Sequence, residues 1–262
     1  MSADFYDLDT ASVARGDGIR DLTVTDRWNT PLGKPNGGYL LAVMLRGLQA
    51  EMDADNPLVA AVTFLSSPVP GPAELRTSTI RMGRRVQTGL ASLWEGERQV
   101  AELTASFGPR GTGPSAELGS APQLPPPDQC ADPLDHGMTA DGLFGRVDYR
   151  LASTPGWSVG APNGDPSIEL WQRLHGGREI DFAALALLCD SFAPPVLELG
   201  DGFQQSMTVQ LTVHLHRLPR PGWIATRLST RHVVNGFHNE DCELWDEEGN
   251  LLAQSRQLAI LL

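Results

Sequence analysis

Two stretches of the chain are almost entirely apolar and predict two buried helices. The first is GGYLLAVMLRGLQAEM (37–52), and the second is DFAALALLCDSF (181–192). The run 182–189 carries no polar side chain, a pattern typical of a helix that is buried on all sides. Asn36 and Asp181 stand at the two starts, where a side-chain oxygen can accept a hydrogen bond from a first-turn N–H. We therefore expect one helix over each range.

The strand-like segments occur twice in the same order. VTFLSSPVPGPAELRTST (62–79) leads to GLASLWEGERQVAELTASF (89–107), and LTVHLHRLPRPGWIATRLST (211–230) leads to CELWDEEGNLLAQSRQLAIL (242–261). Trp245 lies 151 residues after Trp94, and other matched positions keep nearly the same offset. The segments WEGERQV and WDEEGNL, rich in Gly and acidic residues, predict a turn between two strands in each copy. We therefore interpret the two segments as the copies of an internal repeat.

Each copy is expected to be one helix followed by an antiparallel sheet, an α+β unit in which the helix covers one face of the sheet. The segment PRGTGPSAELGSAPQLPPPDQCADPLD (109–135) between the copies is rich in Pro, Gly and Ser, which favours an extended connector. The expected organisation is an N-terminal unit over residues 1–110, a linker over 111–139 and a C-terminal unit over 140–262.

Composition narrows the class of partner. The 262 residues are 41% hydrophobic and 20% charged, which is typical of a globular protein with a core. A formal net charge of −12 argues against nucleic acid and anionic membrane as partners. The N-terminus MSADFYDLDT lacks the basic and apolar regions of a signal peptide, and no run is long enough for a membrane span. Three cysteines without metal-like spacing suit reduced thiols, so a cytoplasmic location is expected.

A single helix wrapped by a long antiparallel sheet is the hotdog unit, and two units in one chain make a double hotdog. The segments PNGGYLLAVML, LALLCDSF, SMTVQLTVHLHR and LLAQSRQLAIL resemble the acyl-CoA thioesterase II family, and the resemblance covers nearly the whole chain except the linker. It implies hydrolysis of acyl-CoA to free acid and coenzyme A, in fatty acid metabolism, without a cofactor. It also implies that a water-activating Asp, Thr and Gln of the second unit fall on Asp190, Thr208 and Gln257.

Asp190 directly follows the second apolar run, and its carboxyl group has two interpretations. Near the C-terminal end of a buried helix, a carboxylate faces the negative end of the helix dipole and loses hydration; both effects raise its pKa. The nearest cationic residue downstream is Arg217. A raised pKa suits a base that activates water. The alternative is a carboxyl that only bonds local amides where the loop to Pro194 begins.

Gln257 is a candidate for orienting that water. Strand alternation puts it on one face with the small residues Ala253, Ser255 and Ala259, so its amide could reach a helix packed there. An amide can accept and donate without changing charge. The equivalent position of the first copy is Ala105, which predicts a single active site in the second unit and a binding role for the first. The alternative is a solvated side chain on the outer face.

Thr208 opens the strand MTVQLTVHLHR and is expected to share its face with Gln210, Thr212 and His214. Its hydroxyl can donate and accept, so it can hold water or the aspartate carboxylate. Thr is also a good strand former, and a purely structural role stays open.

The substrate contacts are expected at the start of the first helix. Free N–H groups at Asn36, Gly37 and Gly38 suit a carbonyl oxygen that becomes an oxyanion, although plain capping geometry explains the same residues. Trp28 lies just before this turn and could line an acyl tunnel, belong to the core or lie on the surface.

The densest basic cluster is RMGRR, in which Arg84 and Arg85, with Arg81, could bind the phosphates of coenzyme A. A solvated strand end is the alternative. His214 and His216 lie two apart, but two ligands are too few for a metal site, so no metal is expected.

Two other functions stay open at this point. A non-catalytic acyl-CoA-binding protein would use the same fold, and so would a double-hotdog enoyl-CoA hydratase, which depends on an Asp–His pair that the chain does not show near a helix. Hotdog folds tend to associate through exposed sheet edges and faces, so a homo-oligomer, a dimer or higher, is expected.

Overall fold

The computed structural model describes residues 5–111, 113–136, 138–203 and 205–262. Its three α-helices within these ranges are α1 (Phe5–Asp9), α2 (Gly37–Met52) and α3 (Phe182–Leu188). Asn36 Oδ1 accepts from Tyr39 N at 2.9 Å and Asp181 Oδ1 accepts from Ala184 N at 2.7 Å, which confirms both expected N-caps.

The second helix is shorter than the sequence predicts. It ends at Leu188, because the Asp190 N–H turns back to Leu187 O at 3.0 Å, a tightened last turn after which the chain leaves toward Pro194. Asp190 therefore lies in a turn just beyond α3 and not on the helix.

The strands of the first half are β1 (Val13–Gly16), β2 (Ile19–Val24), β3 (Pro57–Phe64), β4 (Gly71–Met82), β5 (Gln87–Glu95) and β6 (Arg98–Phe107). Those of the second half are β7 (Val147–Leu151), β8 (Ser167–Leu174), β9 (Ser206–Leu215), β10 (Ile224–Ser229), β11 (Val233–Val234), β12 (Phe237–Trp245) and β13 (Leu251–Leu261). Short 3-10 helices are η1 (Asp26–Trp28), η2 (Pro127–Gln129), η3 (Pro133–His136), η4 (Gly142–Gly145), η5 (Gly156–Val159) and η6 (Pro195–Leu199).

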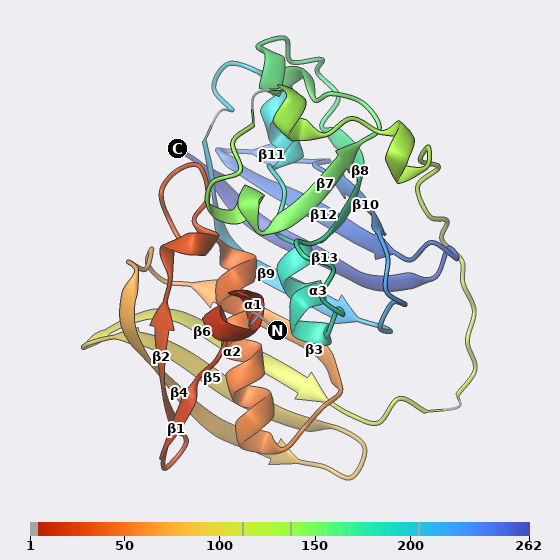
Figure 1. Ribbon diagram of the computed structural model, residues 1–262. Coiled ribbons are helices and arrows are strands. Elements are labelled where there is room, and N and C mark those ends of the chain that lie inside the picture. Colours follow the sequence, from red (N-terminus) through yellow and green to blue (C-terminus); the bar gives the residue numbers. More distant parts are fainter. Residues whose placement is uncertain (1–4, 112, 137, 204) are drawn as a thin grey trace.

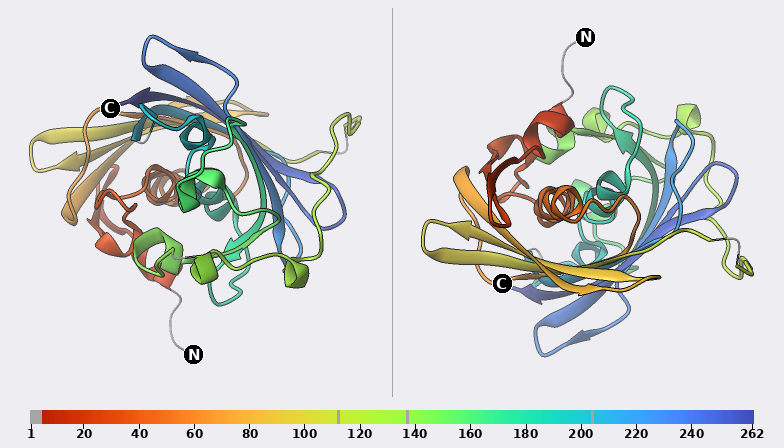
Figure 2. Two further views of the ribbon diagram at one scale, coloured as in Figure 1. Left: turned by 90° about the horizontal axis from the view of Figure 1, so that it is seen from above. Right: turned by 90° about the horizontal axis from the view of Figure 1, so that it is seen from below.

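All described strands pair antiparallel in one continuous sheet, in the order β1-β2-β4-β5-β6-β3-β9-β13-β12-β10-β8-β7, with β11 paired to β12. The two halves meet where β3 pairs with β9. Figure 1 and Figure 2 show the sheet curving around α2 and α3, which lie side by side on its concave face. The structure thus confirms two units, each with a central helix wrapped by an antiparallel sheet.

The expected hairpins are confirmed as β5–β6 and β12–β13. The sequence reading missed the strands that precede each helix, β1 and β2 in the first half and β7 and β8 in the second. In β7 and β8, buried and less buried positions alternate, so the signal was present in VDYRL and SIELWQRL. In each unit, two paired antiparallel strands precede the central helix.

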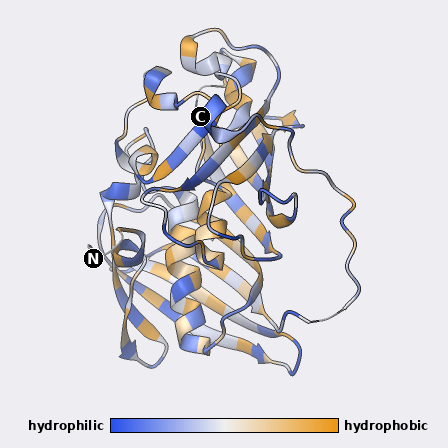
Figure 3. Ribbon diagram, turned by 45° about the vertical axis from the view of Figure 1, so that its right-hand side comes forward, coloured by the Kyte–Doolittle hydropathy of each residue, from blue (hydrophilic) through white to orange (hydrophobic). Residues whose placement is uncertain are grey.

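The core fills the space between the helices and the sheet. Leu40, Leu41, Leu45 and Leu48 of α2 are at most 1% exposed, and every residue of α3 is buried. Hydrophobic residues accordingly follow the two helices and alternate along the strands in Figure 3. The N-terminal end of α2 lies against the C-terminal end of α3, because a Cβ at Gly38 would sit 2.6 Å from Leu187 O. The first turn of α2 therefore packs against the last turn of α3, next to Asp190.

Candidate active site

The Asp190 carboxylate is bound by the first turn of the other unit's helix. Gly38 N donates to Asp190 Oδ2 at 2.7 Å, and Asn36 Nδ2 donates to the same oxygen at 3.1 Å and to Asp190 O at 2.7 Å. The carboxylate thus faces the positive end of the α2 dipole as well as the negative end of α3, which was the only dipole expected from the sequence.

Glycine is required at this junction because the chains approach so closely. A Cβ at Gly38 would lie 2.9 Å from Asp190 Cβ, and a Cβ at Gly37 would lie 2.9 Å from Asp190 Oδ2 and 3.1 Å from Phe64 Cζ. Contacts this short force a shift of the neighbouring atoms. The PNGG segment is therefore both a helix start and a cradle for Asp190.

The expected role of Asn36 and Gly38 in binding an oxyanion needs correction. The Gly38 N–H is already used by Asp190, and the Asn36 N–H donates to Trp28 O at 3.0 Å. Gly37 is half-buried while both of its neighbours are buried. Of the three amides, that of Gly37 is the one left for a substrate oxygen.

Burial and hydrogen bonding act against each other on Asp190. Desolvation raises the pKa of its carboxyl to about 6, while hydrogen bonds from the Gly38 amide, Asn36 and Gln257 lower it. The residue keeps some solvent-accessible surface, as a base that must meet water requires. Near neutral pH it is therefore an anion that accepts a proton readily.

Gln257 and Thr208 lie together at this carboxylate. Gln257 is 6% exposed on the inner face of β13, and the Thr208 hydroxyl donates to Gln257 Oε1 at 2.7 Å. The expected alternation of β13 is confirmed, because Ala253, Ser255 and Ala259 are also buried there. The structure thus brings Asp190, Thr208 and Gln257 together, although they come from three different elements.

The prediction that Thr208 shares its strand face with Gln210, Thr212 and His214 is wrong. Leu258 pairs with Gln210 but Ala259 pairs with Thr208, so Val209 is an extra residue, a β-bulge. The bulge reverses the alternation: Gln210 and His214 are exposed on the outer face, while Thr208 points inward to Gln257. Thr208 reaches the site because the strand is irregular there.

A second buried carboxyl group, which the sequence reading missed, adjoins the three residues. Glu240 is 2% exposed and pairs with Gln257 across β12 and β13. Desolvation, and next the charge of Asp190, raise the pKa of Glu240 to about 8, although hydrogen bonding with Gln257 lowers it. A signal existed, because Glu240 alternates with Cys242 and Leu244 on one strand face.

The aromatic residue expected near the substrate has a core role. The Trp28 ring is 1% exposed, stacks on Tyr39 at 5.6 Å between centroids and donates from Nε1 to Asp9 Oδ2 at 2.9 Å. This packing favours the core alternative over a tunnel wall. Trp28 affects the site through its backbone carbonyl, which accepts from Asn36 N.

Arg84 and Arg85 are exposed in the turn between β4 and β5, after Arg81 at the end of β4. Gly89 of the same hairpin packs on Leu48 and Met52, at the C-terminal end of α2, whereas Asp190 contacts its N-terminal end. The 16 residues of α2 separate the two by about 20 Å. The structure therefore does not bring these arginines to Asp190.

The histidine pair lies at the edge of the second unit. His214 is exposed on β9, and His216 follows the strand, where its carbonyl accepts from Arg110. Among the described residues, no group of three or more His, Cys, Asp or Glu side chains is placed to hold a metal ion.

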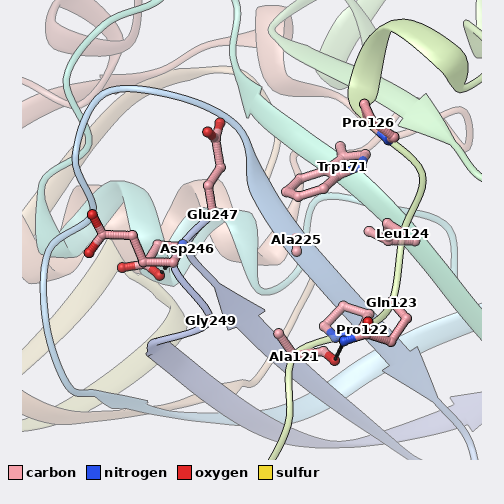
Figure 4. A pocket seen from close by; sticks show the side chains of 11 residues that line it. Ala121, Pro122, Gln123, Leu124, Pro126, Trp171, Ala225, Asp246, Glu247 and Gly249 are labelled. Carbon is pink, nitrogen blue, oxygen red and sulfur yellow. Dashed lines mark hydrogen bonds between the residues drawn. The ribbon is translucent and has the colours of Figure 1, made fainter.

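A hollow of about 400 Å³ lies elsewhere, on the outer face of the sheet, between residues 121–124, Pro126, Trp171 and the turn 246–249 (Figure 4). Its carboxylates already hold local structure, since Asp246 accepts from Glu248 N and Asn250 N, and Glu247 accepts from Trp223 N. Gln172, next to Trp171 on β8, points inward to Leu188 O. The hollow is thus on the opposite side of the sheet from Asp190.

Comparison with known proteins decides the family. A family model described as the acyl-CoA thioesterase N-terminal domain matches residues 24–108, and one described as the C-terminal domain matches residues 127–261. The chain belongs to the acyl-CoA thioesterase family. It is a thioester hydrolase with a double-hotdog fold.

Similar proteins cover almost the whole thioesterase chain. The uncharacterised protein Rv0499 of Mycobacterium tuberculosis is 28% identical over 255 residues, covering 87% of this chain and 86% of its own. The crystal structure of a protein assigned to thioesterase II from Thermobifida fusca superposes with a TM-score of 0.88 at 27% identity, covering 100% and 99% of the two chains. A hot dog protein of Alicyclobacillus acidocaldarius has a TM-score of 0.87 at 23% identity over 98% and 97%, which shows the shared fold. In the described part of this thioesterase, no helix is long and apolar enough to cross a membrane.

Proposed function

We propose that this thioesterase hydrolyses acyl-CoA with a water molecule activated by Asp190 and oriented by Thr208 and Gln257. The observation that carries the proposal is a carboxylate with a raised pKa, bound by Gly38 N and Asn36, beside a hydrogen-bonded Thr–Gln pair. A base whose pKa lies near neutrality takes a proton from water more readily than an ordinary carboxylate does.

Each group has one task in the proposed reaction. Asp190 takes a proton from water, whose oxygen adds to the thioester carbonyl carbon and makes a tetrahedral oxyanion. Collapse of that intermediate breaks the carbon–sulfur bond and releases the carboxylic acid and the coenzyme A thiolate. The thiolate takes the proton held by Asp190, which restores the carboxylate. The half-buried Gly37 amide, at the positive end of α2, is the proposed donor to the oxyanion.

Thr208 restricts Gln257 to one orientation. Because the Thr208 hydroxyl donates to Gln257 Oε1, the amide nitrogen is directed away from Thr208 and toward the carboxyl groups. A fixed amide next to the base limits the positions that the attacking water can take, and such positioning lowers the entropic cost of the reaction.

The test is the release of free thiol from acyl-CoA substrates of varied chain length. We expect Asp190→Asn to lower kcat about a hundredfold or more, because it removes the base, and Gln257→Ala to lower it about tenfold. Gln254→Ala is the matched control, since Gln254 is exposed on the outer face of the same strand. Undiminished turnover in Asp190→Asn contradicts the assignment of the base, and hydration of an enoyl-CoA by the wild type in place of thiol release contradicts the reaction itself.

A further inference from the structure

Glu240 is a buried acidic residue beside Gln257 that has no role in the proposed reaction. It lies opposite Gln257 in the strand register, on the same inward face, and is 2% exposed. Buried carboxyl groups are rare unless they are paired, because desolvation is costly. A carboxyl at this position therefore calls for an explanation beyond packing.

A second polar atom without a hydrogen-bond partner lies beside the Glu240 carboxyl group. Glu240 Oε2 is buried without a hydrogen-bond partner in the described part of the chain, and so is Thr230 Oγ1. The last pair of β10 with β12 is Ser229 with Asp241, so Thr230, the next residue, follows in register beside Glu240. Two unpartnered polar atoms at adjacent positions indicate a small polar site next to Gln257.

Among the described residues, the charges that shift the pKa of Glu240 are those of Asp190 and Asp241, and Asp241 is itself paired with Arg256 on the outer face of the sheet. Asp190 lies near Glu240, in the turn after α3, and Cys189 directly follows that helix. Asp241 and Cys242 are the next two residues after Glu240 on β12. Burial lowers the pKa of the His238 imidazole, which lies two residues before Glu240 on the same face. Gln257 acts on both carboxyl groups by hydrogen bonding, so the amide connects Asp190 to Glu240.

Two buried carboxyl groups that share one amide do not readily ionise together. We propose that Glu240 is a positioning residue of this reaction centre: as the protonated member of a pair with Asp190, it fixes the Gln257 amide and leaves a single negative charge, on Asp190. The inference rests on the proposed function, because the base it serves is Asp190.

A neutral Glu240 helps the reaction in two ways. Its carboxyl accepts from the Gln257 amide without competing with the Asp190 anion as a full charge would. It also keeps a second negative charge away from the oxyanion, which would be destabilised by repulsion in a poorly solvated site. Ionisation of Glu240 is therefore expected to lower kcat even though Asp190 stays ionised.

The test compares pH profiles of kcat for the wild type, Glu240→Gln and Glu240→Ala. The kcat of the wild type should show a bell-shaped dependence on pH, with an acid limb near pH 6 and an alkaline limb near pH 8. Glu240→Gln mimics the protonated acid, so it should keep kcat at pH 7 within about threefold and lose the alkaline limb, whereas Glu240→Ala should lose about tenfold. Glu243→Gln, on the outer face of β12, is the control and should keep the bell.

Several outcomes overturn the proposal. An unchanged alkaline limb in Glu240→Gln does so, and so do equal losses in the Gln and Ala variants, which would indicate packing alone.

A second measurement does not depend on turnover. Carbon NMR titration of the side-chain carboxyl groups, with the Glu240 signal assigned by its absence in Glu240→Gln, should show a lower Glu240 pKa in Asp190→Asn than in the wild type. If the two values are equal, there is no pair and the proposal fails whatever the activity. If the pair is present but the wild type releases no thiol from any acyl-CoA, the proposed function fails and the role of Glu240 in that reaction fails with it.

Discussion

The two halves of the thioesterase place different side chains at the same position of the same hairpin. In the first half Gly89 pairs with Ala105, and in the second half Glu240 pairs with Gln257. Leu48 and Met52 of α2 pack over Gly89, so the first copy is apolar there. The second copy has two polar side chains on the same inner face. One repeat has an apolar core at the position where the other has the proposed reaction centre.

The difference does not make the first half a passive copy. Its helix begins at the site, and Asn36 and Gly38 provide hydrogen bonds to Asp190 of the second half. Because a helix N-terminus stabilises an anion, α2 partly offsets the cost of burying that carboxylate. The proposed site therefore combines a carboxylate from one half with the helix start of the other.

Because the second copy buries Glu240, the free energy of unfolding is expected to depend on pH. The folded pKa of Glu240, about 8, lies above that of an unfolded Glu, so the folded state holds the extra proton between about pH 4.5 and 8. Stability is therefore lost as pH rises through that window. Glu240→Gln should remove this loss. At pH 8 the free energy of unfolding of the variant should exceed that of the wild type by about 3 kcal/mol or more, whereas at pH 5 the two should differ little. Denaturant unfolding at the two pH values checks it, and equal differences at both would contradict the burial of an acid there.

The converse change places the amide in the apolar copy. Ala105→Gln adds a larger polar side chain at a position that is 0% exposed and has no polar partner across from it, so we expect a loss of about 2 kcal/mol or more in unfolding free energy. Thr104→Gln, on the exposed face of the same strand, is the control. Both free energies of unfolding are measured with denaturant. If Ala105→Gln leaves this free energy unchanged, the first copy tolerates polar side chains as the second does.

The smallest change tests the contact between the halves. Gly38→Ala should cost about 1 to 3 kcal/mol of stability and also lower kcat about tenfold, because the new Cβ pushes against Leu187 O and Asp190. Gly47→Ala adds a methyl group to the same helix against Leu75, away from Asp190, and should leave kcat unchanged. Thermal unfolding and thiol release measured on both variants separate packing from positioning. Equal kcat values in the two would mean that the approach of α2 does not position the base.

Much of this arrangement could be predicted from the sequence. The matched turns predicted both hairpins, the caps Asn36 and Asp181 marked both helix starts, and the repeat singled out Gln257 against Ala105. These signals are local or periodic, so a single chain carries them. The resemblance to the thioesterase family then pointed to Asp190 and Thr208, which the structure brings to Gln257.

The remainder depended on contacts between distant parts of the chain. The bond from Gly38 N to Asp190 joins residues 152 positions apart, and nothing near Gly38 in the sequence indicates that its amide is occupied. The bulge at Val209 leaves no mark in MTVQLTV, although it decides which way Thr208 points. The alternation of Glu240 with Cys242 and Leu244 indicates a shared strand face, but nothing near Glu240 in the sequence indicates that Asp190 lies close to it.

The most direct test of the central claim is the pH dependence of kcat for thiol release, measured below pH 7 in the wild type and in Asp190→Asn. Asp190 must be ionised to accept a proton from water, and burial raises its pKa to about 6. Wild-type kcat should therefore rise tenfold per pH unit below that value and level off above it, while the residual activity of Asp190→Asn should not rise through this limb. A wild-type profile without a limb near pH 6, or the same limb in both proteins, would contradict Asp190 as the base.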